Sequence, residues 1–272
     1  MRKYPDAILV NLANSGPVRF RRQIVTVHDL AFLKDRTWFR SPFRWWYRYL
    51  IPRLCRRALA VVTVSEFIQK EVCATYHLQE KKVQVVPNGL PAMDFLPERP
   101  VDDPYLLMVG IQNPRKNARF VLNQQDEIHK MGLHILGLRG AGRIYGSTNF
   151  KENRHFHIFS GVDDRSYYTF LKHAEALAFP SPYEGFGIPI LEALVLGTPV
   201  LVPDLPSYRT SFGEGPLYYK EGDAGDFIAR LNEARVQKTS TKGESNLKIK
   251  YNFEHSSGIL ADVINISRHE NK

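Results

Sequence analysis

Two glutamates bracket a turn that is rich in glycine. Glu184 precedes the turn, Glu192 follows eight positions later, and Gly185 and Gly187 stand between them. Glycines let backbone N–H groups approach a ligand closely, and a helix that begins after the turn points its positive end at that ligand. The pattern favours a phosphate-bearing ligand whose sugar hydroxyls donate hydrogen bonds to the carboxylates. The alternative is a purely structural strand-to-helix turn with both glutamates on a solvated face.

The segments around this turn predict a parallel α/β unit. Residues 176–179 are apolar and predict a strand, and residues 188–196 predict an apolar helix that ends at Gly197 and Pro199. A strand, a glycine turn, a helix and a second strand are the repeating unit of parallel sheets. Glu192 then lies about two helical turns beyond the loop.

A pair of cations occupies a second strand-to-helix turn. Residues 105–109 predict a buried strand that ends at Gly110, and a helix is expected from about Ala118. Arg115 and Lys116 lie between them, where cations and a helix N-terminus can share one anion. Adjacent basic residues are usually just solvated, so this pair alone is a weak signal.

A histidine follows a third predicted strand. The run I-V-T-V at 24–27 predicts a buried strand that starts at Gln23, and His28 and Asp29 come directly after it. Ligands of open α/β sheets bind beyond the carboxyl ends of the strands, which makes His28 a candidate for ligand contact. Alternatively, His28 caps the strand or donates to a loop carbonyl. We expect Asp29 to be structural, either orienting the histidine or capping the following turn.

Three segments resemble signatures of the retaining glycosyltransferases of family 4, which have the GT-B fold. They are E-G-F-G-I-P-I-L-E at 184–192, V-G-I-Q-N-P-R-K-N at 109–117 and V-T-V-H-D-L at 25–30. The first match extends through Gly197 to Val200, and the resemblance covers the chain from Asn11 to about Ile266. It implies an α/β, GT-B type protein with two Rossmann-like parallel-sheet domains.

The resemblance also implies roles for individual residues. Glu184 would contact the donor sugar and Glu192 the ribose, while Arg115 and Lys116 would neutralise the donor diphosphate. His28 would line the donor-sugar pocket. We favour positioning over nucleophilic attack for Glu184, with the acceptor attacking from the face of the leaving group. The implied catalytic residues are Glu184, His28, Arg115 and Lys116, and the implied substrate-binding residues are Gly185, Phe186, Gly187, Ile188 and Glu192.

The resemblance sets the expected domain boundaries. Residues 1–100 are expected to form a partial N-terminal, acceptor-side domain and a linker, with the proline-rich stretch 91–104 connecting the domains. Residues 101–252 would form the domain that binds the nucleotide sugar, and 253–272 a helix that can cross back to the first domain. Family members carry a longer segment before the H-D-L motif, so we expect an incomplete first domain that is too small to bury a core alone.

Composition narrows the class of protein. The 272 residues are 43% hydrophobic and no apolar run reaches the roughly 18 residues of a membrane span, which predicts a cytoplasmic protein. The formal net charge of +9 indicates an anionic partner. Two cysteines, Cys55 and Cys73, have no metal-ligand spacing, and no carboxylate pattern accompanies His155, His157 and His173. We therefore expect neither a metal nor a cofactor.

Residues 38–57 are dense in aromatic and arginine side chains. Arg40, Arg44 and Arg48 recur every four positions, so they would share one face of a helix flanked by tryptophans. A basic segment of this kind fits an anionic membrane surface and suggests peripheral association with the inner membrane. Nucleic acid is not expected because no recognition motif accompanies the charge. The alternative is a helix packed on the domain core with a solvated arginine edge.

The expected function is transfer of a hexose from a nucleotide diphosphate sugar to a glycan or lipid-linked acceptor, in surface polysaccharide synthesis. A second hypothesis is a non-catalytic or half-enzyme subunit that binds the nucleotide sugar and needs a partner chain to complete the acceptor domain. A third is a GT-B epimerase acting on the nucleotide sugar itself, against which the P-R-K-N and E-x7-E motifs argue.

Overall fold

The computed structural model describes residues 7–140, 150–237 and 244–269. These residues form two compact units, each built on one parallel β-sheet. Unit 1 contains the chain up to Leu90, the short segment Glu184–Phe186 and the chain from Lys250 onward. Unit 2 contains Pro91–Tyr183 and Gly187–Ile249. The predicted α/β class with two parallel sheets is confirmed.

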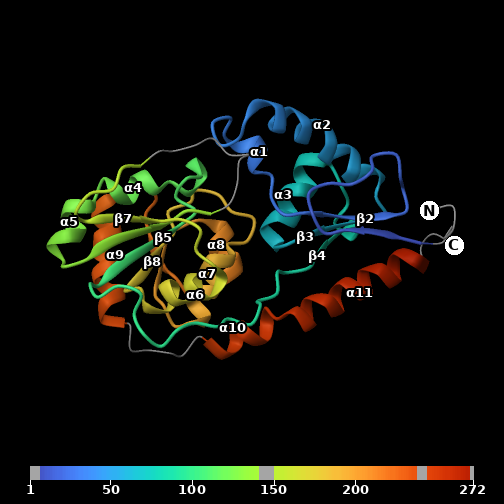
Figure 1. The fold of residues 1–272 in the computed structure, drawn as a ribbon. Coiled ribbons are helices and arrows are strands. Elements are labelled where there is room, and N and C mark those ends of the chain that lie inside the picture. Colours follow the sequence, from blue (N-terminus) through green and yellow to red (C-terminus); the bar gives the residue numbers. More distant parts are fainter. Residues whose placement is uncertain (1–6, 141–149, 238–243, 270–272) are drawn as a thin grey trace. The chain divides into compact units, whose positions relative to one another are not determined.

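Unit 1 holds four strands in the order β1-β2-β3-β4, all parallel (Figure 1). Strand β2 is buried at all five positions, as its residues I-V-T-V at 24–27 predict. Ser65 precedes helix α3, and its hydroxyl accepts a hydrogen bond from Ile68 N, so it is the N-cap that starts the helix. The elements are β1 (Leu9–Asn11), β2 (Gln23–Val27), α1 (Ala31–Lys34), α2 (Ser41–Arg57), β3 (Ala60–Thr63), α3 (Glu66–Tyr76), η1 (Glu80–Lys82), β4 (Val83–Val85) and α11 (Phe253–His269).

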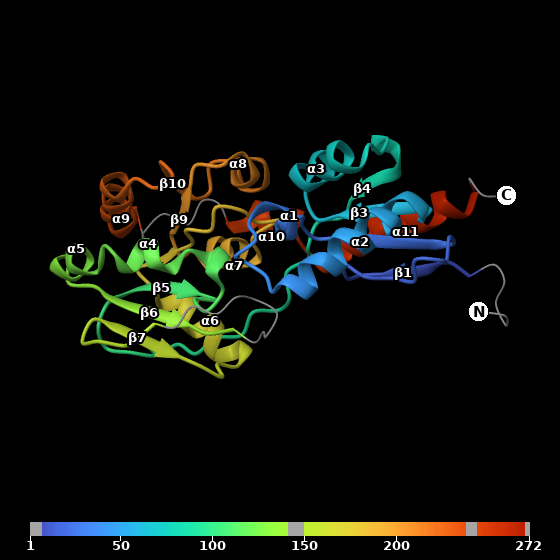
Figure 2. The ribbon, with the colours of Figure 1, turned by 90° about the horizontal axis from the view of Figure 1, so that it is seen from above.

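Helices cover both faces of this sheet. Helix α11, the last of the chain, packs Val263 against Ile24 and Val62 on one face. Helix α2 lies on the other face, as the views in Figure 1 and Figure 2 agree. Strand residues alternate between the two faces, so each face receives its own apolar row. The C-terminal helix is therefore part of the core of unit 1.

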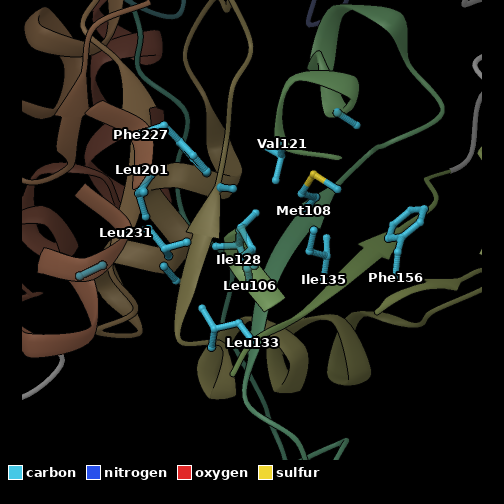
Figure 3. Packing of buried hydrophobic residues seen from close by; sticks show 14 of the residues in the cluster. Leu106, Met108, Val121, Ile128, Leu133, Ile135, Phe156, Leu201, Phe227 and Leu231 are labelled. Carbon is cyan, nitrogen blue, oxygen red and sulfur yellow. The ribbon is translucent and has the colours of Figure 1, made fainter. Parts of the chain in front are cut away.

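Unit 2 holds six parallel strands in the order β10-β9-β8-β5-β6-β7. Figure 3 shows its core, in which side chains of β5 and β6 meet helix side chains such as Val121 and Phe227. The elements are β5 (Tyr105–Val109), η2 (Pro114–Lys116), α4 (Ala118–Leu122), α5 (Gln125–Lys130), β6 (His134–Leu138), β7 (Phe156–Phe159), α6 (Asp164–His173), β8 (Ala176–Ala178), α7 (Ile188–Val195), β9 (Val200–Pro203), α8 (Pro206–Phe212), β10 (Leu217–Tyr219), α9 (Ala224–Gln237) and α10 (Glu244–Lys250).

The proline-rich stretch 91–104 lies on unit 2. Leu96 N–H donates to Thr169 Oγ1 at 2.9 Å, and Arg99 forms an ion pair with Glu175 at 3.4 Å. These contacts hold the stretch against helix α6 and the residues that follow it. Within the described residues, no helix combines the length and the apolar character needed to cross a membrane.

Candidate active site

The glycine turn has the backbone geometry that its sequence predicts. Gly187 has φ of +99°, a value that side-chain-bearing residues rarely adopt, and it caps the start of α7. A Cβ atom added there would lie 2.9 Å from Ile190 Cδ1. Pro189, near the start of the helix, needs no N–H partner in this first turn. Glycine at 187 therefore lets the chain pass directly from the loop into the helix.

Arg115 is held in place by backbone groups. It lies in η2, directly after β5, and the Asn113 side chain accepts a hydrogen bond from Arg115 N–H at 3.1 Å. Only 8% of Arg115 is exposed, and its Nη1 donates to Tyr183 O at 3.2 Å. The guanidinium is thus fixed beside the peptide that joins Tyr183 to Glu184.

Ser181 connects the two signature segments, and sequence reasoning did not single it out. Its side chain is fully buried, and its Oγ lies 3.1 Å from both Arg115 O and Tyr183 O. The hydroxyl therefore has two carbonyl acceptors, one on each segment. Tyr208 OH donates to Ser181 O at 2.8 Å and anchors this point to α8. The only sequence signal for Ser181 is its place between two prolines in the family motif.

Lys116 lies over an aromatic ring. Its Nζ is 4.1 Å from the centroid of Phe179, which follows β8 directly. A cation in this position is attracted by the ring face, and the contact limits the conformations of the long side chain. The structure therefore brings both predicted cations to the carboxyl ends of the neighbouring strands β5 and β8.

Glu192 is buried rather than solvated. It is 6% exposed on α7 and accepts hydrogen bonds from Tyr167 OH at 2.6 Å and Tyr168 OH at 3.2 Å, both on α6. Burial raises the pKa of Glu192, and the two tyrosine hydrogen bonds oppose that rise. The tyrosines were not found from sequence because their only link to Glu192 is tertiary.

Glu184, Gly185 and Phe186 group with unit 1. Glu184 is 6% exposed, so neither glutamate of the motif lies on a solvated face. Gly185 O accepts a hydrogen bond from Ser65 Oγ at 2.7 Å. A Cβ atom on Gly185 would collide with His28 O, so this close approach requires glycine. Ile188, the first residue of α7, is 41% exposed.

His28 is oriented by a neighbouring loop. Its backbone N–H donates to Asn14 Oδ1 at 2.7 Å, and its Nε2 lies 2.8 Å from Leu12 O. A carbonyl only accepts, so Nε2 donates in this contact. Asp29 Oδ1 accepts from Ala31 N–H at 3.0 Å and so caps the following turn, as expected. The role of His28 in a donor-sugar pocket remains a prediction.

The histidines of unit 2 form a stacked cluster. His155 stacks on His129 with ring centroids 3.3 Å apart, and His134 Nδ1 lies 3.3 Å from His157 Nε2. His173 is held elsewhere, with its Nε2 at 3.0 Å from Leu96 O. Within the part of the chain that the structure describes, no three His, Cys, Asp or Glu side chains are arranged to hold a metal ion.

Helix α2 carries the basic and aromatic segment. The helix begins at Ser41, so Arg40 is its cap rather than a member of the predicted arginine row. Arg44 Nε donates to Phe32 O at 3.0 Å, which fixes this arginine to the unit. Trp45 and Trp46 are 73% and 55% exposed. The exposed face of α2 is therefore aromatic as well as basic.

The family models and the curated relatives that match this chain are all glycosyltransferases. The model of the glycosyl transferases group 1 matches residues 93–252, and the model of glycosyltransferase family 4 matches residues 3–92. The O-antigen chain mannosyltransferase RfbU of Salmonella typhimurium is 25% identical over 249 residues, covering 86% of this chain and 67% of that protein. The O-antigen chain mannosyltransferase B of Escherichia coli is 25% identical over 261 residues, covering 85% and 66%. The chain thus spans about two thirds of these relatives.

Solved structures share the fold. Sucrose-phosphate synthase of Thermosynechococcus elongatus superposes with a TM-score of 0.68 at 17% identity, covering 90% of this chain and 67% of that one. HepE of Anabaena, in complex with UDP and glucose, gives 0.69 at 14% identity, covering 89% and 71%. With a family model matching more than half of its length and these GT-B neighbours, the chain belongs to the group 1 glycosyltransferases and has the GT-B fold.

Proposed function

We propose that the chain transfers a hexose from a nucleotide diphosphate sugar to a glycan or lipid-linked acceptor, with retention at the anomeric carbon. The names of two relatives, both O-antigen chain mannosyltransferases, favour mannose as the hexose and surface polysaccharide as the product. HepE, which shares the fold, was solved with UDP and glucose, and this supports a nucleotide sugar as the donor.

The observation that carries the proposal is the network that joins Arg115 to the glycine turn. Ser181 and Tyr183 bind Arg115 from the segment that leads into Glu184. A cation that is already fixed does not have to reorganise when negative charge develops, so it stabilises a transition state better than a mobile one. The arrangement suits departure of a diphosphate from the sugar.

The proposed reaction uses cations of the protein rather than a metal or a cofactor. Arg115 and Lys116 stabilise the negative charge that grows on the leaving diphosphate, assisted by backbone N–H groups at the start of α7. The bond from the anomeric carbon to the diphosphate breaks, the acceptor hydroxyl forms the new glycosidic bond on the same face, and its proton passes to the leaving phosphate oxygen. Glu184 positions the sugar hydroxyls.

Glu192 is proposed to hold the ribose of the donor. Its two oxygens accept from Tyr167 and Tyr168, and each keeps a lone pair for a further donor. The tyrosines fix the carboxylate in one orientation, so a ribose hydroxyl meets a prepared acceptor.

The first test measures thermal stabilisation by UDP, GDP, ADP and CMP. A ligand that binds only the folded state raises the apparent stability by mass action. We expect one nucleoside diphosphate to raise the unfolding midpoint of the wild type and to raise that of Glu192→Gln much less. The matched control is Glu233→Gln, which removes a carboxylate on α9. No shift with any nucleotide in a folded protein would contradict the proposed donor site.

Transfer is then tested by incubating the chain with the sugar donor that carries the nucleotide selected above and with acceptors that end in mannose, and by measuring glycoside formation.

A second candidate function is a nucleotide-sugar-binding subunit that needs a partner chain. It is favoured by the smaller sheet of unit 1, which has four strands where the sheet of unit 2 has six. Stabilisation by a nucleotide without transfer by the isolated chain would support the subunit. Transfer by the isolated chain would exclude it, and a change in sugar stereochemistry without transfer would indicate an epimerase.

We also propose that α2 contacts an anionic membrane, which would bring the chain to a lipid-linked acceptor. Trp45, Trp46 and Tyr49 are exposed aromatic side chains on a helix that has no acidic residue. Aromatic side chains enter the headgroup region, and arginines attract anionic lipids. Co-sedimentation with phosphatidylglycerol vesicles should be lost in Trp45→Ser/Trp46→Ser. The control is Val236→Ser/Ile249→Ser, which removes two exposed apolar side chains of unit 2, and co-sedimentation should persist in it. An equal loss of co-sedimentation in both double variants would contradict the proposal.

A further inference from the structure

Unit 1 has an open pocket at the edge of its sheet that lies opposite His28. The pocket has a volume of about 610 Å³. It is lined by Arg21, which precedes β2, by Leu59 and Ala60 at the start of β3, and by Lys82, which precedes β4. Because the strands are parallel, their amino ends meet at one edge, whereas His28 follows the carboxyl end of β2. The pocket is therefore distinct from the edge at which open α/β sheets bind their usual ligand.

The arginine and lysine side chains that line this pocket face no acidic residue in its lining. Five basic side chains line it, and none of the lining residues is an aspartate or a glutamate. They come from separate segments, so the charge is a product of the fold and not of one basic run. The basic side chains are Arg21, Arg56, Arg57, Lys81 and Lys82.

Some of these basic side chains stabilise the C-terminal ends of helices, but others do not. Helices α2 and α3 both end at the pocket, and a cation near a helix C-terminus is stabilised by the helix dipole. Lys82 serves this purpose, because its Nζ donates to Arg56 O at 2.7 Å. Arg57 Nη1 reaches Val18 O at 3.5 Å. Arg21 and Lys81 belong to neither helix, so they add positive charge beyond what the helix ends require.

Large apolar side chains also line the pocket, beside polar residues such as Gln84 and Ser267. Leu59 precedes β3, Leu78 follows α3, and Val263 and Ile266 belong to α11. Ile266 is 56% exposed, so an apolar group is available to a bound molecule. A ligand that matches both the basic and the apolar lining residues has an anionic group next to a carbon skeleton.

We propose that this pocket is a second binding site, separate from the donor site, for a phosphate-bearing ligand. Several arginine and lysine donors around one cavity match the oxygens of a phosphate monoester or diphosphate, which accept charge-assisted hydrogen bonds. The apolar lining residues distinguish two sources of that chemistry. A free phosphate compound would use the cations alone, whereas a lipid phosphate would also contact Ile266.

The test measures binding of inorganic pyrophosphate by calorimetry. The pocket variant is Arg21→Gln/Arg56→Gln/Lys81→Gln, which removes three exposed charges. The matched control is Lys151→Gln/Arg154→Gln/Lys220→Gln, which removes three exposed charges from unit 2 and leaves the same net charge. Every titration is made with the donor site saturated by the nucleoside diphosphate selected above, because free pyrophosphate would otherwise also bind at Arg115 and Lys116. Lys116→Gln serves as the donor-site variant. Under these conditions we expect pyrophosphate affinity to fall at least tenfold in the pocket variant and to persist in the other two.

Three results would overturn the proposal. One is unchanged pyrophosphate affinity in the pocket variant, and another is an equal loss in the pocket variant and its control, which would indicate non-specific attraction to net charge. The third is a loss in Lys116→Gln alone, which would place the anion at the donor site. Nucleotide stabilisation should be retained by the pocket variant, and that retention also shows that the variant is folded.

The source of the phosphate is resolved with dihexanoyl phosphatidate, a soluble lipid with a phosphate monoester headgroup. Tighter binding of this lipid than of pyrophosphate, reduced by Ile266→Ser while pyrophosphate binding is unchanged, would assign a lipid phosphate. Equal binding of both compounds, insensitive to Ile266→Ser, would assign a free phosphate compound. Both outcomes support the site, because both require the pocket cations.

Discussion

Unit 2 and unit 1 each gather basic side chains near one edge of a parallel sheet, but they hold those side chains differently. In unit 2, Arg115 is 8% exposed and bonded to a backbone carbonyl, and Lys116 lies over Phe179. In unit 1, Arg21 and Lys81 are exposed around an open pocket. Charges that are fixed and shielded from water interact more strongly with a ligand than exposed charges, which salt screens. The first arrangement suits stabilisation of a transition state, and the second suits reversible capture of an anion.

The largest effect is expected from a change that keeps the charge of unit 2 but removes its geometry. Arg115→Lys retains a cation and loses the planar group that reaches Tyr183 O. We expect kcat to fall by about 100-fold or more, the scale seen when one fixed donor to a developing charge is lost. Arg119→Lys, in the adjacent α4 and exposed, is the control and should leave kcat unchanged. Equal kcat for wild type and Arg115→Lys would remove the contrast between the two units.

A smaller effect, on donor affinity, should follow from removing a hydrogen bond that orients Glu192. Tyr167→Phe removes the hydrogen bond of 2.6 Å that opposes the rise in the pKa of Glu192. The pKa should therefore rise further, and the carboxyl should become protonated at a higher pH. A hydrogen bond to a charged group contributes roughly 1.5–3 kcal/mol. Donor affinity should start to weaken at a higher pH than in the wild type as the solution is acidified, which a series of binding isotherms would detect.

Tyr168→Phe is the internal comparison for that experiment. Its hydrogen bond to Glu192 is longer, at 3.2 Å, so the pH at which affinity falls should shift less. A larger shift for Tyr168→Phe than for Tyr167→Phe would show that the tyrosines do not tune Glu192 in the way proposed.

Salt separates the two sets of cations directly. The Debye length is about 10 Å at 0.1 M salt and about 3 Å at 1 M, so exposed charges are screened and shielded ones are affected less. Pyrophosphate binding at the unit 1 pocket should weaken several-fold more than nucleotide binding across this range. The comparison is made by calorimetry on the same protein preparation. Parallel weakening of both ligands would mean that the two sites are equally exposed to solvent.

The smallest effect concerns the histidine cluster of unit 2, where protonation would add charge next to existing cations. Burial, followed by His129, Arg154 and His134, lowers the pKa of His155 from its ordinary value of 6.5, while Asp126 opposes the shift. At a pH between these two pKa values, the unfolded chain binds a proton at His155 that the folded chain does not bind. The resulting stability is present above pH 6.5 and is lost as the pH falls through the lowered pKa of the folded state.

The check is urea unfolding at a series of pH values between 5 and 8. His155→Phe should reduce the loss of stability on acidification, because the titrating ring is gone. His255→Phe, an exposed histidine of α11, should leave the acid dependence as it is in the wild type. An unaltered acid dependence in His155→Phe would mean that the cluster does not control it.

Several features could be predicted because their causes are local in the chain. The strand at 23–27 contains the β-branched run I-V-T-V. Ser65 is a side chain that caps a helix, and the motif at 184–192 needs Gly187 where the chain turns into α7. The same short motifs carried the family resemblance, which the family models confirm. Local patterns therefore sufficed for the parallel α/β class and the family.

Other features could not be predicted because they join residues that are distant in the chain. Ser181 meets Arg115 across 66 positions, and Tyr167 meets Glu192 across 25. Nothing in the local sequence of a tyrosine or a serine indicates which distant group it will contact. The composition of the stretch 91–104 predicts that it connects the domains, and only the structure shows that Leu96 and Arg99 bind unit 2.

The sequence by itself determined which residues could carry charge or turn the chain, because residue type and spacing are local properties. Only the tertiary structure decided which of those charges are buried and which are exposed, because burial depends on neighbours from other segments. Arg115 and Arg56 are alike as residues, but one is fixed beside Tyr183 and the other lines an open pocket. That difference in surroundings, and not in residue type, separates the candidate catalytic cation from the proposed phosphate-binding one.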